Sequence, residues 1–443
     1  MSITKKSLVF ICCICIHYSF VPQSWSEMDW SIVNLKEQMV SPPSHITDTI
    51  LFGSSVAISD QYAIIGSKEN SQIAYKGGSA YIFEKKEGKW LCVQEIFGSE
   101  NNIKDYLGTS VALTGNYVFA GAHNYDLDEN NKDVGIVYVY QRQASGDWIQ
   151  TQTLMPDTIE DSHSFGFSMA TYNTQLVVGA FGDRDESGKV FLFELEDNQW
   201  IQRHCLIPDD PDLGGRFGCS VDIYQDYIIV GAYLGFDYQG AVYIFQRLES
   251  GWKQMELIKY PILDQIGHFG YAVSINDHYA AVGSKSEREN AGIRSTGAVY
   301  VYQRNNDTWE QMPKLLAPNL QKDDKFGLSI DLEGNILAVG GTKMDSDVVD
   351  SGSVNIYRIE ENSFSFLRKI AAQQPRVYSL FASSLAMNRN NILIGAIGYV
   401  NSNEHKTGSA YFYSLEMPSS PFGPDNVLGM DDIIHWLQIL SGN

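Results

Sequence analysis

Residues 51–58 read LFGSSVAI, residues 64–67 read IIGS, and residues 77–83 read GGSAYIF. These three pieces form a phrase that recurs seven times: a Phe-Gly-like pair, a Gly-Ala-like pair fourteen residues later, and a glycine that opens a Tyr-x-Phe segment. A period of about fifty residues predicts one supersecondary unit that is copied along a single closed body. The later copies begin at Leu107, Phe165, Phe217, Phe269, Phe326 and Phe381.

Each copy predicts four short antiparallel strands. The first follows the Phe-Gly pair, the second ends in the Gly-Ala-like pair, and the third begins at the Tyr-x-Phe segment. The fold class is therefore all-β, a seven-bladed β-propeller of four-stranded antiparallel blades. The fourth strand begins at an aromatic residue in six copies. We expect Trp148, Trp200, Trp252 and Trp309 to be largely buried between neighbouring blades. The six aromatic residues are Trp90, Trp148, Trp200, Trp252, Trp309 and Phe364.

The seventh copy lacks a fourth strand, and the N-terminal part of the chain offers a replacement. Residues 30–42 (WSIVNLKEQMVSP) resemble the fourth strand of the second copy, with Gln38 at the position of Gln152. This register places Asn34 at the aromatic position. We expect this strand to complete blade seven and close the ring, because closure removes the exposed edges of an open array. The propeller would span residues 27–416.

The two ends of the chain fall outside the repeat. Residues 1–26 resemble a secretory signal peptide, with Lys5 and Lys6 before a mostly apolar run and small residues at its end. An uncleaved anchor is the alternative, although the run is short for a membrane span of about 20 residues. We expect no membrane span in the mature chain. Residues 417–443 predict a linker and a short helical tail.

Composition limits the partners. The chain carries 53 acidic and 32 basic residues and a net charge of −21, which argues against nucleic acid or an anionic membrane as the main partner. An acidic balance suits a soluble exported protein, and we expect a monomeric propeller. Outside the signal-like segment only Cys92, Cys205 and Cys219 remain, on different repeats, which predicts no disulfide framework.

The Phe-Gly and Gly-Ala pairs at this spacing resemble the FG-GAP repeat of integrin α-subunit N-terminal propellers and of many secreted microbial proteins. The resemblance covers nearly all of the chain beyond the signal-like segment. It implies the propeller fold, but it says little about function, since propellers host many activities. The tail, in turn, resembles the second half of a dockerin-like or EF-hand loop and its exit helix.

One departure from the integrin pattern concerns calcium. Integrin blades often hold calcium in a long Asp-rich hairpin between strands one and two. Here these hairpins are tight, as in ISDQYA and IYQDYI, and have no room for that ligand set. The resemblance is therefore closer to the microbial variant, and the integrin calcium sites are not carried over.

Loop lengths point to one functional face. Only the connection between strands two and three varies, from 9 to 14 residues between its glycines. This connection and the loop from strand four to the next blade lie at the same end of each unit. Because variable loops on a rigid scaffold tend to carry function, we expect binding at this end.

Acidic residues in these loops suggest a cation. Alternating oxygen ligands in the second copy can wrap a hard cation such as Ca²⁺, which takes six to eight oxygens. The alternative is a solvated turn, which Asp and Asn also favour. The candidate metal ligands are Asp126, Asp128, Asn130 and Asp133.

Aromatic and acidic side chains on the same loops suggest a contact surface for a protein or a glycan. The alternatives are packing for the aromatic residues and solubility for the acids. The candidate binding residues are Tyr125, Phe181, Tyr233, Phe236, Tyr238, Asp209, Asp210 and Asp212.

Catalytic motifs are absent from the sequence. It contains no Gly-x-Ser-x-Gly, no His-Glu-x-x-His and no phosphate loop, and its nine histidines do not cluster. We therefore name no catalytic residue and do not expect an enzyme. The favoured function is a secreted or cell-surface recognition or adhesion module that binds a protein or glycan. The alternatives are an extracellular hydrolase or lyase with its site at the axis mouth, and a calcium-dependent structural scaffold.

Overall fold

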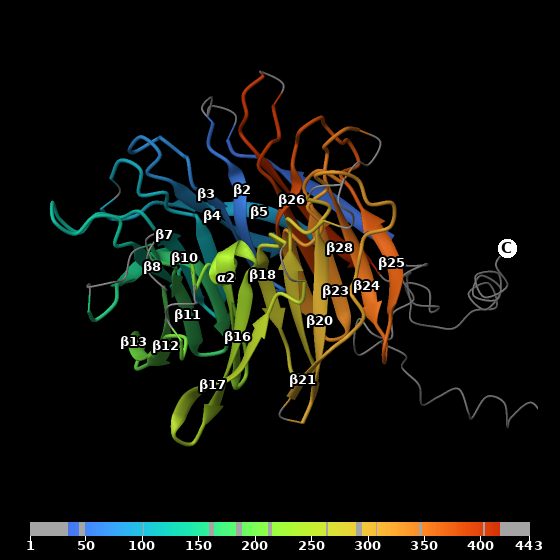
Figure 1. The fold of residues 1–443 in the computed structure, drawn as a ribbon. Coiled ribbons are helices and arrows are strands. Elements are labelled where there is room, and N and C mark those ends of the chain that lie inside the picture. The colour runs from blue at the N-terminus through green and yellow to red at the C-terminus, as the bar shows by residue number, and fades with distance from the viewer. Residues whose placement is uncertain are drawn as a thin grey trace, which may run out of the picture.

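The computed structural model describes residues 34–43, 49–100, 102–158, 164–182, 188–210, 215–262, 265–288, 295–306, 308–344, 348–401 and 404–416. In these ranges the chain forms seven four-stranded antiparallel sheets arranged around a central axis (Figure 1). The seven-bladed propeller is therefore confirmed. The signal-like segment and the predicted helical tail lie outside the described residues.

Blades one to four follow the chain order. Blade one holds β2 (Phe52–Ile58), β3 (Tyr62–Ser67), β4 (Ser79–Lys86) and β5 (Lys89–Ile96). Blade two holds β6 (Ser110–Thr114), β7 (Tyr117–Ala122), β8 (Ile136–Arg142) and β9 (Trp148–Leu154). Blade three holds β10 (Phe165–Tyr172), β11 (Gln175–Ala180), β12 (Lys189–Glu196) and β13 (Gln199–Leu206). Blade four holds β14 (Ser220–Tyr224), β15 (Tyr227–Ala232), β16 (Ala241–Leu248) and β17 (Gly251–Lys259).

The remaining blades complete the ring. Blade five holds β18 (Phe269–Ile275), β19 (Tyr279–Ser284), β20 (Ala298–Asn305) and β21 (Thr308–Gln311). Blade six holds β22 (Ser329–Glu333), β23 (Ile336–Gly341), β24 (Ser353–Ile359) and β25 (Phe364–Ile370). Blade seven holds β26 (Phe381–Asn388), β27 (Asn391–Ala396), β28 (Ser409–Glu416) and β1 (Asn34–Val40). A short turn, α2 (Gly235–Tyr238), lies in the loop between β15 and β16.

The N-terminal strand closes the ring as the sequence predicts. β1 pairs antiparallel with β28, with Asn34 opposite Glu416. Gln38 donates from Nε2 to the Trp90 carbonyl at 2.6 Å and accepts from the Trp90 amide at 2.9 Å. Gln152 makes the same pair of bonds to Trp200, so the predicted alignment of Gln38 with Gln152 is confirmed. The described cysteines are free, which agrees with the absence of a disulfide framework.

Neighbouring blades touch backbone to backbone at the repeated glycines. A Cβ atom on Gly66 would lie 2.1 Å from the carbonyl oxygen of Gly108 in the next blade, so no side chain fits there. Gly108 itself has a φ of 86°, a conformation that glycine adopts without strain. The same contact recurs around the ring, and only blade seven replaces the Phe-Gly glycine, with Ala382 at a φ of 72°. The Phe-Gly and Gly-Ala pairs are thus two halves of one contact.

A serine hydroxyl reinforces this contact in most blades. Ser55 Oγ donates to the Gly108 carbonyl at 2.9 Å, from strand one of one blade to the Phe-Gly turn of the next. Blade five has Ala272 at the serine position and lacks the bond. The equivalent donors are Ser110, Ser168, Ser220, Ser329 and Ser384.

The tryptophans of strand four wedge against the preceding blade. Trp200 packs edge-on against Tyr117 and Phe119, with ring centroids 5.5 and 5.0 Å apart. Trp148 and Trp200 are buried as expected, whereas Trp252 and Trp309 are only half-buried, so the prediction is wrong for these two. In blade three the position of Tyr117 is taken by Gln175, which removes the aromatic partner of Trp252. Trp309 lies in β21, a strand of only four residues.

Replacing Trp200 with Ala should cost about 3–5 kcal/mol of unfolding free energy, the range for a large core aromatic residue. Replacing Trp252 with Ala should cost clearly less, because that side chain is half-buried. Urea denaturation of both variants measures the difference. A loss below about 1 kcal/mol at Trp200 would show that the ring does not wedge the blades.

Ala272→Ser should restore the missing hydroxyl bond to the Gly327 carbonyl and raise stability by about 1 kcal/mol, the net value of one hydrogen bond. Ser220→Ala, which removes the equivalent bond in blade four, is the matched opposite change and should lower stability by a similar amount. Thermal and urea unfolding compare the two. A destabilised Ala272→Ser variant would show that blade five has no room for the bond.

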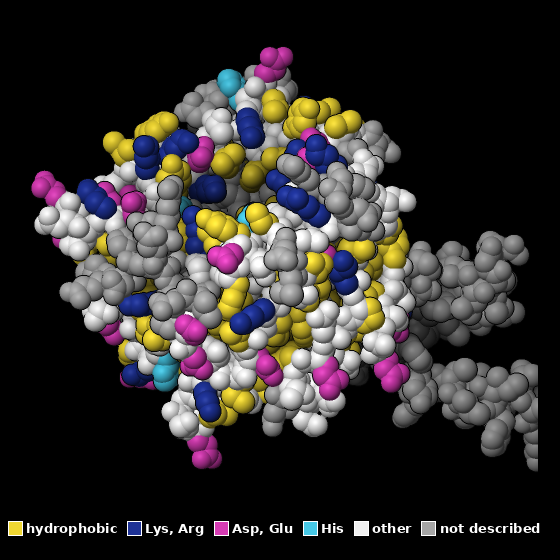
Figure 2. All heavy atoms as spheres, in the orientation of Figure 1, with side chains coloured by type: hydrophobic (Ala, Val, Ile, Leu, Met, Phe, Trp, Pro, Cys, Tyr) yellow, Lys and Arg dark blue, Asp and Glu magenta, His cyan; other side chains and the backbone are white. Residues whose placement is uncertain are grey.

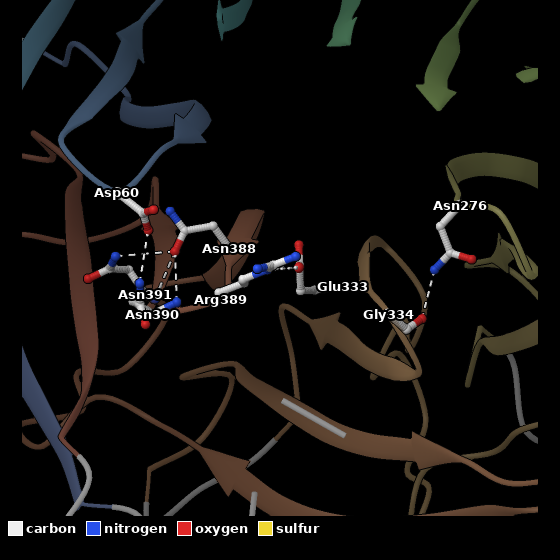
Figure 3. Close-up of polar contacts among 8 residues, drawn as sticks. All are labelled: Asp60, Asn276, Glu333, Gly334, Asn388, Arg389, Asn390 and Asn391. Carbon is white, nitrogen blue, oxygen red and sulfur yellow. Dashed lines mark hydrogen bonds and ion pairs between the residues drawn. The ribbon is translucent and has the colours of Figure 1, made fainter. Parts of the chain in front are cut away.

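The two ends of the propeller differ in character. The hairpins between strands one and two contain only two or three residues, and we call this end the constant face. Its hairpins are bonded to one another across blades five, six, seven and one (Figure 3). The contacts are Asn276 Nδ2 to Gly334 O (2.7 Å), Arg389 Nε to Glu333 Oε1 (3.6 Å) and Asn390 Nδ2 to Asp60 Oδ1 (3.0 Å). The opposite end, the variable face, carries the loops between strands two and three and between blades.

Candidate ligand-binding site at the mouth of the axial channel

Strand one of every blade faces the axis, where these strands enclose a channel of about 310 Å³. The strand-one residue that lies five positions after the start of the Phe-Gly-like pair lines this channel in each blade, and it is alanine in four of them. Small side chains are required there, because seven strands converge on one axis. The seven residues are Ala57, Ala112, Ala170, Asp222, Ser274, Asp331 and Ala386.

The two aspartates in the channel tie neighbouring blades together. Asp222 Oδ2 accepts from Ser274 Oγ at 3.0 Å and from the Ile275 amide at 2.8 Å. Asp331 Oδ2 accepts from the Met387 amide at 2.7 Å. Burial raises the pKa of Asp222 to about 6, and burial together with the Asp222 charge raises the pKa of Asp331 to about 8.

The channel opens on the constant face into a larger cavity of about 560 Å³. Asp222, Asp331, Asp277 and Glu333 line it, with Arg389 as a counter-charge. This end of the axis is therefore acidic. The carboxylates of Asp222 and Asp331 already accept hydrogen bonds from the backbone, and Glu333 is paired with Arg389 at 3.6 Å.

The opposite end of the axis is lined differently. Figure 2 shows the variable face hollowed near its centre, with Lys, Arg and His side chains along the wall of the hollow. Half-buried aromatic and cationic side chains of blades two to five form a continuous row there, which we call the mouth arc. Its members are Tyr106, His123, Phe167, Phe181, Arg216, Tyr233, Tyr271 and Lys285.

The first half of the mouth arc is aromatic. The His123 ring lies 5.7 Å from the Tyr106 ring and 5.4 Å from the Phe167 ring, measured between centroids. Phe167 in turn meets Phe181 edge-on at 4.6 Å. Burial, with the nearby Lys68 charge, lowers the pKa of His123 to about 4, so this imidazole is neutral at pH 7.

The second half is cationic. The Arg216 guanidinium lies over the Phe181 ring at 4.9 Å and over the Tyr233 ring at 5.6 Å, and it donates a hydrogen bond to Tyr233 Oη. Lys285 Nζ lies over the Tyr271 ring at 3.2 Å and over the Tyr233 ring at 5.6 Å. The aromatic faces therefore hold the two cations on either side of Tyr233.

Burial lowers the pKa of Lys285 from 10.5 to about 8, and the charges of Lys325 and Arg216 act in the same direction. Within the described part of the chain, none of these three cations forms an ion pair with a carboxylate. The mouth thus holds positive charge that is not paired with any carboxylate of the described residues.

Repetition explains how these residues meet. His123, Phe181, Tyr233 and Lys285 each follow the Gly-Ala-like pair directly, at the same place in four successive blades. Because the glycine contact fixes that pair against the next blade, the residue that follows it points to the mouth in these four blades. Arg216 precedes the Phe-Gly pair and has a positive φ of 60°, as do the other residues at this position.

The predicted binding residues divide into two groups. Phe181 and Tyr233 belong to the mouth arc. Tyr125 is buried, donates from its hydroxyl to Glu100 Oε2 at 2.6 Å and has its pKa raised by burial to about 12, so it is a packing residue rather than an exposed platform. Phe236 and Tyr238 lie on α2, outside the arc.

The predicted acidic residues that the structure describes make no recorded contact with the side chains of the arc. Asp209 and Asp210 are exposed in the loop after β13, where the Asp209 amide donates to Gln254 Oε1 at 3.0 Å. Asp212 lies outside the described residues. Lys259 Nζ lies 4.3 Å over the Phe236 ring, so α2 carries a separate cation–aromatic contact.

In the predicted calcium loop, the carboxylate oxygens of Asp126 and Asp128 already accept bonds from donors of the same loop. Asp126 pairs with Lys132 at 2.8 Å and accepts from the Asp133 amide at 2.9 Å. Asp128 accepts from the Asn130 amide at 2.8 Å. Among the described residues, no three His, Cys, Asp or Glu side chains form a group that could hold a metal. Calcium binding stays a prediction, and a cation would have to displace these donors.

The repeat has known relatives. The model of the FG-GAP repeat matches residues 48–83, 90–140, 148–193, 200–245 and 309–357, more than half of the chain. The protein belongs to the FG-GAP repeat family. In this FG-GAP protein each matched segment after the first runs from strand four of one blade through strand three of the next. Each glycine contact therefore joins two segments: Gly66 lies in the first segment and its partner Gly108 in the second.

Two curated relatives are similar over part of this FG-GAP chain. Integrin alpha-11 of Homo sapiens is 27% identical over 201 residues, and that of Mus musculus is 25% identical over 205 residues. The matches cover 39% and 40% of this chain and 16% of each integrin, so the chain spans a small part of their length. A crystal structure of a protein from Lactobacillus plantarum aligns over 73% of this chain and 86% of its own, with 13% identity and a TM-score of 0.47.

Lys285→Met should stabilise the protein at pH 7 by on the order of 1–3 kcal/mol, because it removes a desolvated cation but keeps the apolar stem. Between pH 8 and 10.5 the unfolded chain holds a proton on Lys285 that the folded chain has lost, so wild-type stability rises relative to the variant and the gain disappears. Urea unfolding of both proteins at pH 7 and pH 10 tests this. A variant that is less stable at pH 7 would show that the charge supports the fold.

Proposed function

We propose that this protein is a secreted or cell-surface recognition module that binds a protein or glycan ligand through its variable face. The placement of exposed apolar side chains carries the proposal. Among the described residues the loops of the variable face expose nine large hydrophobic side chains, whereas the hairpins between strands one and two expose none. The nine are Ile73, Tyr75, Ile103, Ile207, Tyr238, Ile266, Val349, Val377 and Tyr378.

This distribution is typical of an interaction surface. The other eight exposed large hydrophobic side chains of the described residues lie on strands, so between the two ends of the propeller only the variable face exposes such groups. Exposed apolar groups at one end mark a contact with another molecule. Tyr75 and Tyr238 are more than half exposed, at 58% and 57%, and each has a hydroxyl that can bond to a polar partner. The constant face, by contrast, presents polar hairpins that are bonded to one another. Recognition therefore fits the variable face better.

Two further observations support the proposal. The family and the similarity to integrin alpha-11 supply a propeller of the kind that presents loops from a rigid ring. The composition of residues 1–26 supports export. Within the described residues, no helix has the length and apolar character that a membrane crossing needs.

A binding screen tests the proposal. The purified protein is applied to a glycan array and to a panel of cell-surface proteins, and each hit is measured again with Tyr75→Ser/Tyr238→Ser. We expect the loss of two interface aromatic residues to weaken binding at least about tenfold. The matched control, Asp277→Ser/His278→Ser, changes two side chains of the constant face and should leave binding unchanged. Hits that depend on the control pair alone would contradict the proposal.

A further inference from the structure

We propose that the mouth of the axial channel on the variable face binds a carboxylate group presented by a protein partner, an inference that rests on the proposed function. Arg216, Lys285 and Lys325 hold the carboxylate, and Tyr233 and Tyr271 position the first two cations. This assigns a chemical class of ligand to the centre of the recognition face.

The first argument is the positive charge of the mouth, which no described carboxylate pairs with. The chain has 53 acidic residues, and some cations elsewhere in the fold form ion pairs with them. Lys314 pairs with Glu287 at 2.7 Å, and Lys132 pairs with Asp126 at 2.8 Å. The mouth cations lie close enough to lower the pKa of Lys285, yet no described carboxylate pairs with them. Like charges gathered in a half-buried hollow raise the energy of the empty protein. An anion that enters the mouth relieves this repulsion.

The second argument is the geometry of the aromatic rings. Lys285 and Arg216 already lie over the faces of Tyr271 and Phe181, at 3.2 and 4.9 Å. The rings therefore aim the cations and do not offer bare faces on which a sugar could stack. A guanidinium has five N–H donors in a planar fork that matches a carboxylate. One Arg216 nitrogen donates to Tyr233, and within the described residues the rest of the fork has no hydrogen-bond acceptor and can meet a ligand.

The third argument selects a protein over a polyanionic chain. Around the cationic mouth, the described loops of blades two to four carry acidic side chains, among them Asp128, Asp209, Asp210 and Asp237. A sulfated or acidic polysaccharide that extends beyond the hollow would bring its further charges over these acids, which costs energy. A protein surface can place one carboxylate at the centre and basic groups around it, which matches both signs.

The probe is a fluorescent peptide with one glutamate between flanking glycines and lysines, compared with the same peptide carrying glutamine. Fluorescence anisotropy with the purified protein should show at least tenfold tighter binding of the glutamate peptide. Arg216→Gln and Lys285→Met should each weaken it at least tenfold. Lys322→Met, which removes an exposed lysine from the loop that contains Lys325, is the matched control and should change affinity less than twofold.

Affinity should also fall as pH rises from 7 to 9, because Lys285 loses its proton in this range, and Lys285→Met should remove that dependence. The dependence of affinity on pH is measured for the wild type and for Lys285→Met, so that the effect of other titrating groups, which is common to both proteins, is subtracted. The groups that face Lys285 are Lys325, Arg216, Cys219 and His268 together with the rings of Tyr233 and Tyr271.

Several outcomes overturn the inference. Equal affinity for the glutamate and glutamine peptides would show that the mouth does not recognise a carboxylate. The absence of binding of either peptide at millimolar concentration would show the same. Dextran sulfate that binds tenfold tighter than the glutamate peptide, with loss in Arg216→Gln, identifies an acidic polysaccharide site instead. Variants that unfold are detected by thermal melting, and Lys285→Met, which should not be destabilised, keeps the test valid.

The experiment separates this inference from the proposed function. A partner found in the screen that needs Tyr75 and Tyr238 but tolerates Arg216→Gln and Lys285→Met leaves the recognition face standing and removes the carboxylate site. If the hits of the screen bind equally well to the Tyr75/Tyr238 variant and to the Arg216 and Lys285 variants, the proposed function itself is wrong. Glutamate-peptide binding without any such partner would support the site alone.

Discussion

One contact between bare backbones governs this structure. The glycine of each Gly-Ala-like pair meets the carbonyl of the Phe-Gly glycine in the next blade, and a single methyl group would not fit between Gly66 and Gly108. A spacing that is set by backbone atoms is the same in every blade, whatever the side chains around it. The tight approach of strands, the small residues along the axis and the tryptophan wedges all follow from it.

The same contact builds the site. It fixes the direction of the residue after the Gly-Ala-like pair, so the equivalent positions of blades two to five converge on one mouth. The repeat provides the same position in each blade, but the residue at that position differs from blade to blade. In blades two to five it is His123, Phe181, Tyr233 and Lys285. At the other end of the axis Asp222 and Asp331 bond to neighbouring strands, so the channel is acidic towards one face and cationic towards the other.

Much of the fold could be predicted from the sequence, because glycine spacing records the inter-blade contact directly. Ring closure followed from the alignment of Gln38, which the structure explains through its bonds to Trp90. Only part of the site could be predicted from the sequence. Phe181 and Tyr233 were found by loop membership, whereas Arg216 and Lys285 were missed, although their constant offset from the repeated pairs marks them. Burial of Tyr125 could not be foreseen, since its carboxylate partner Glu100 lies 25 residues earlier, in the loop that joins blades one and two.

The closure of the ring also has a mechanical meaning. Asn34 lies opposite Glu416 and Val40 opposite Ala410, so the chain enters and leaves the outer edge of blade seven at the same end of one strand pair. Tension between these two points would break the hydrogen bonds of β1 and β28 one after another, as a zipper opens, and not all together in shear. The ring would therefore yield at a low force at its seam, while the other six blades, each continuous in sequence, bear no load.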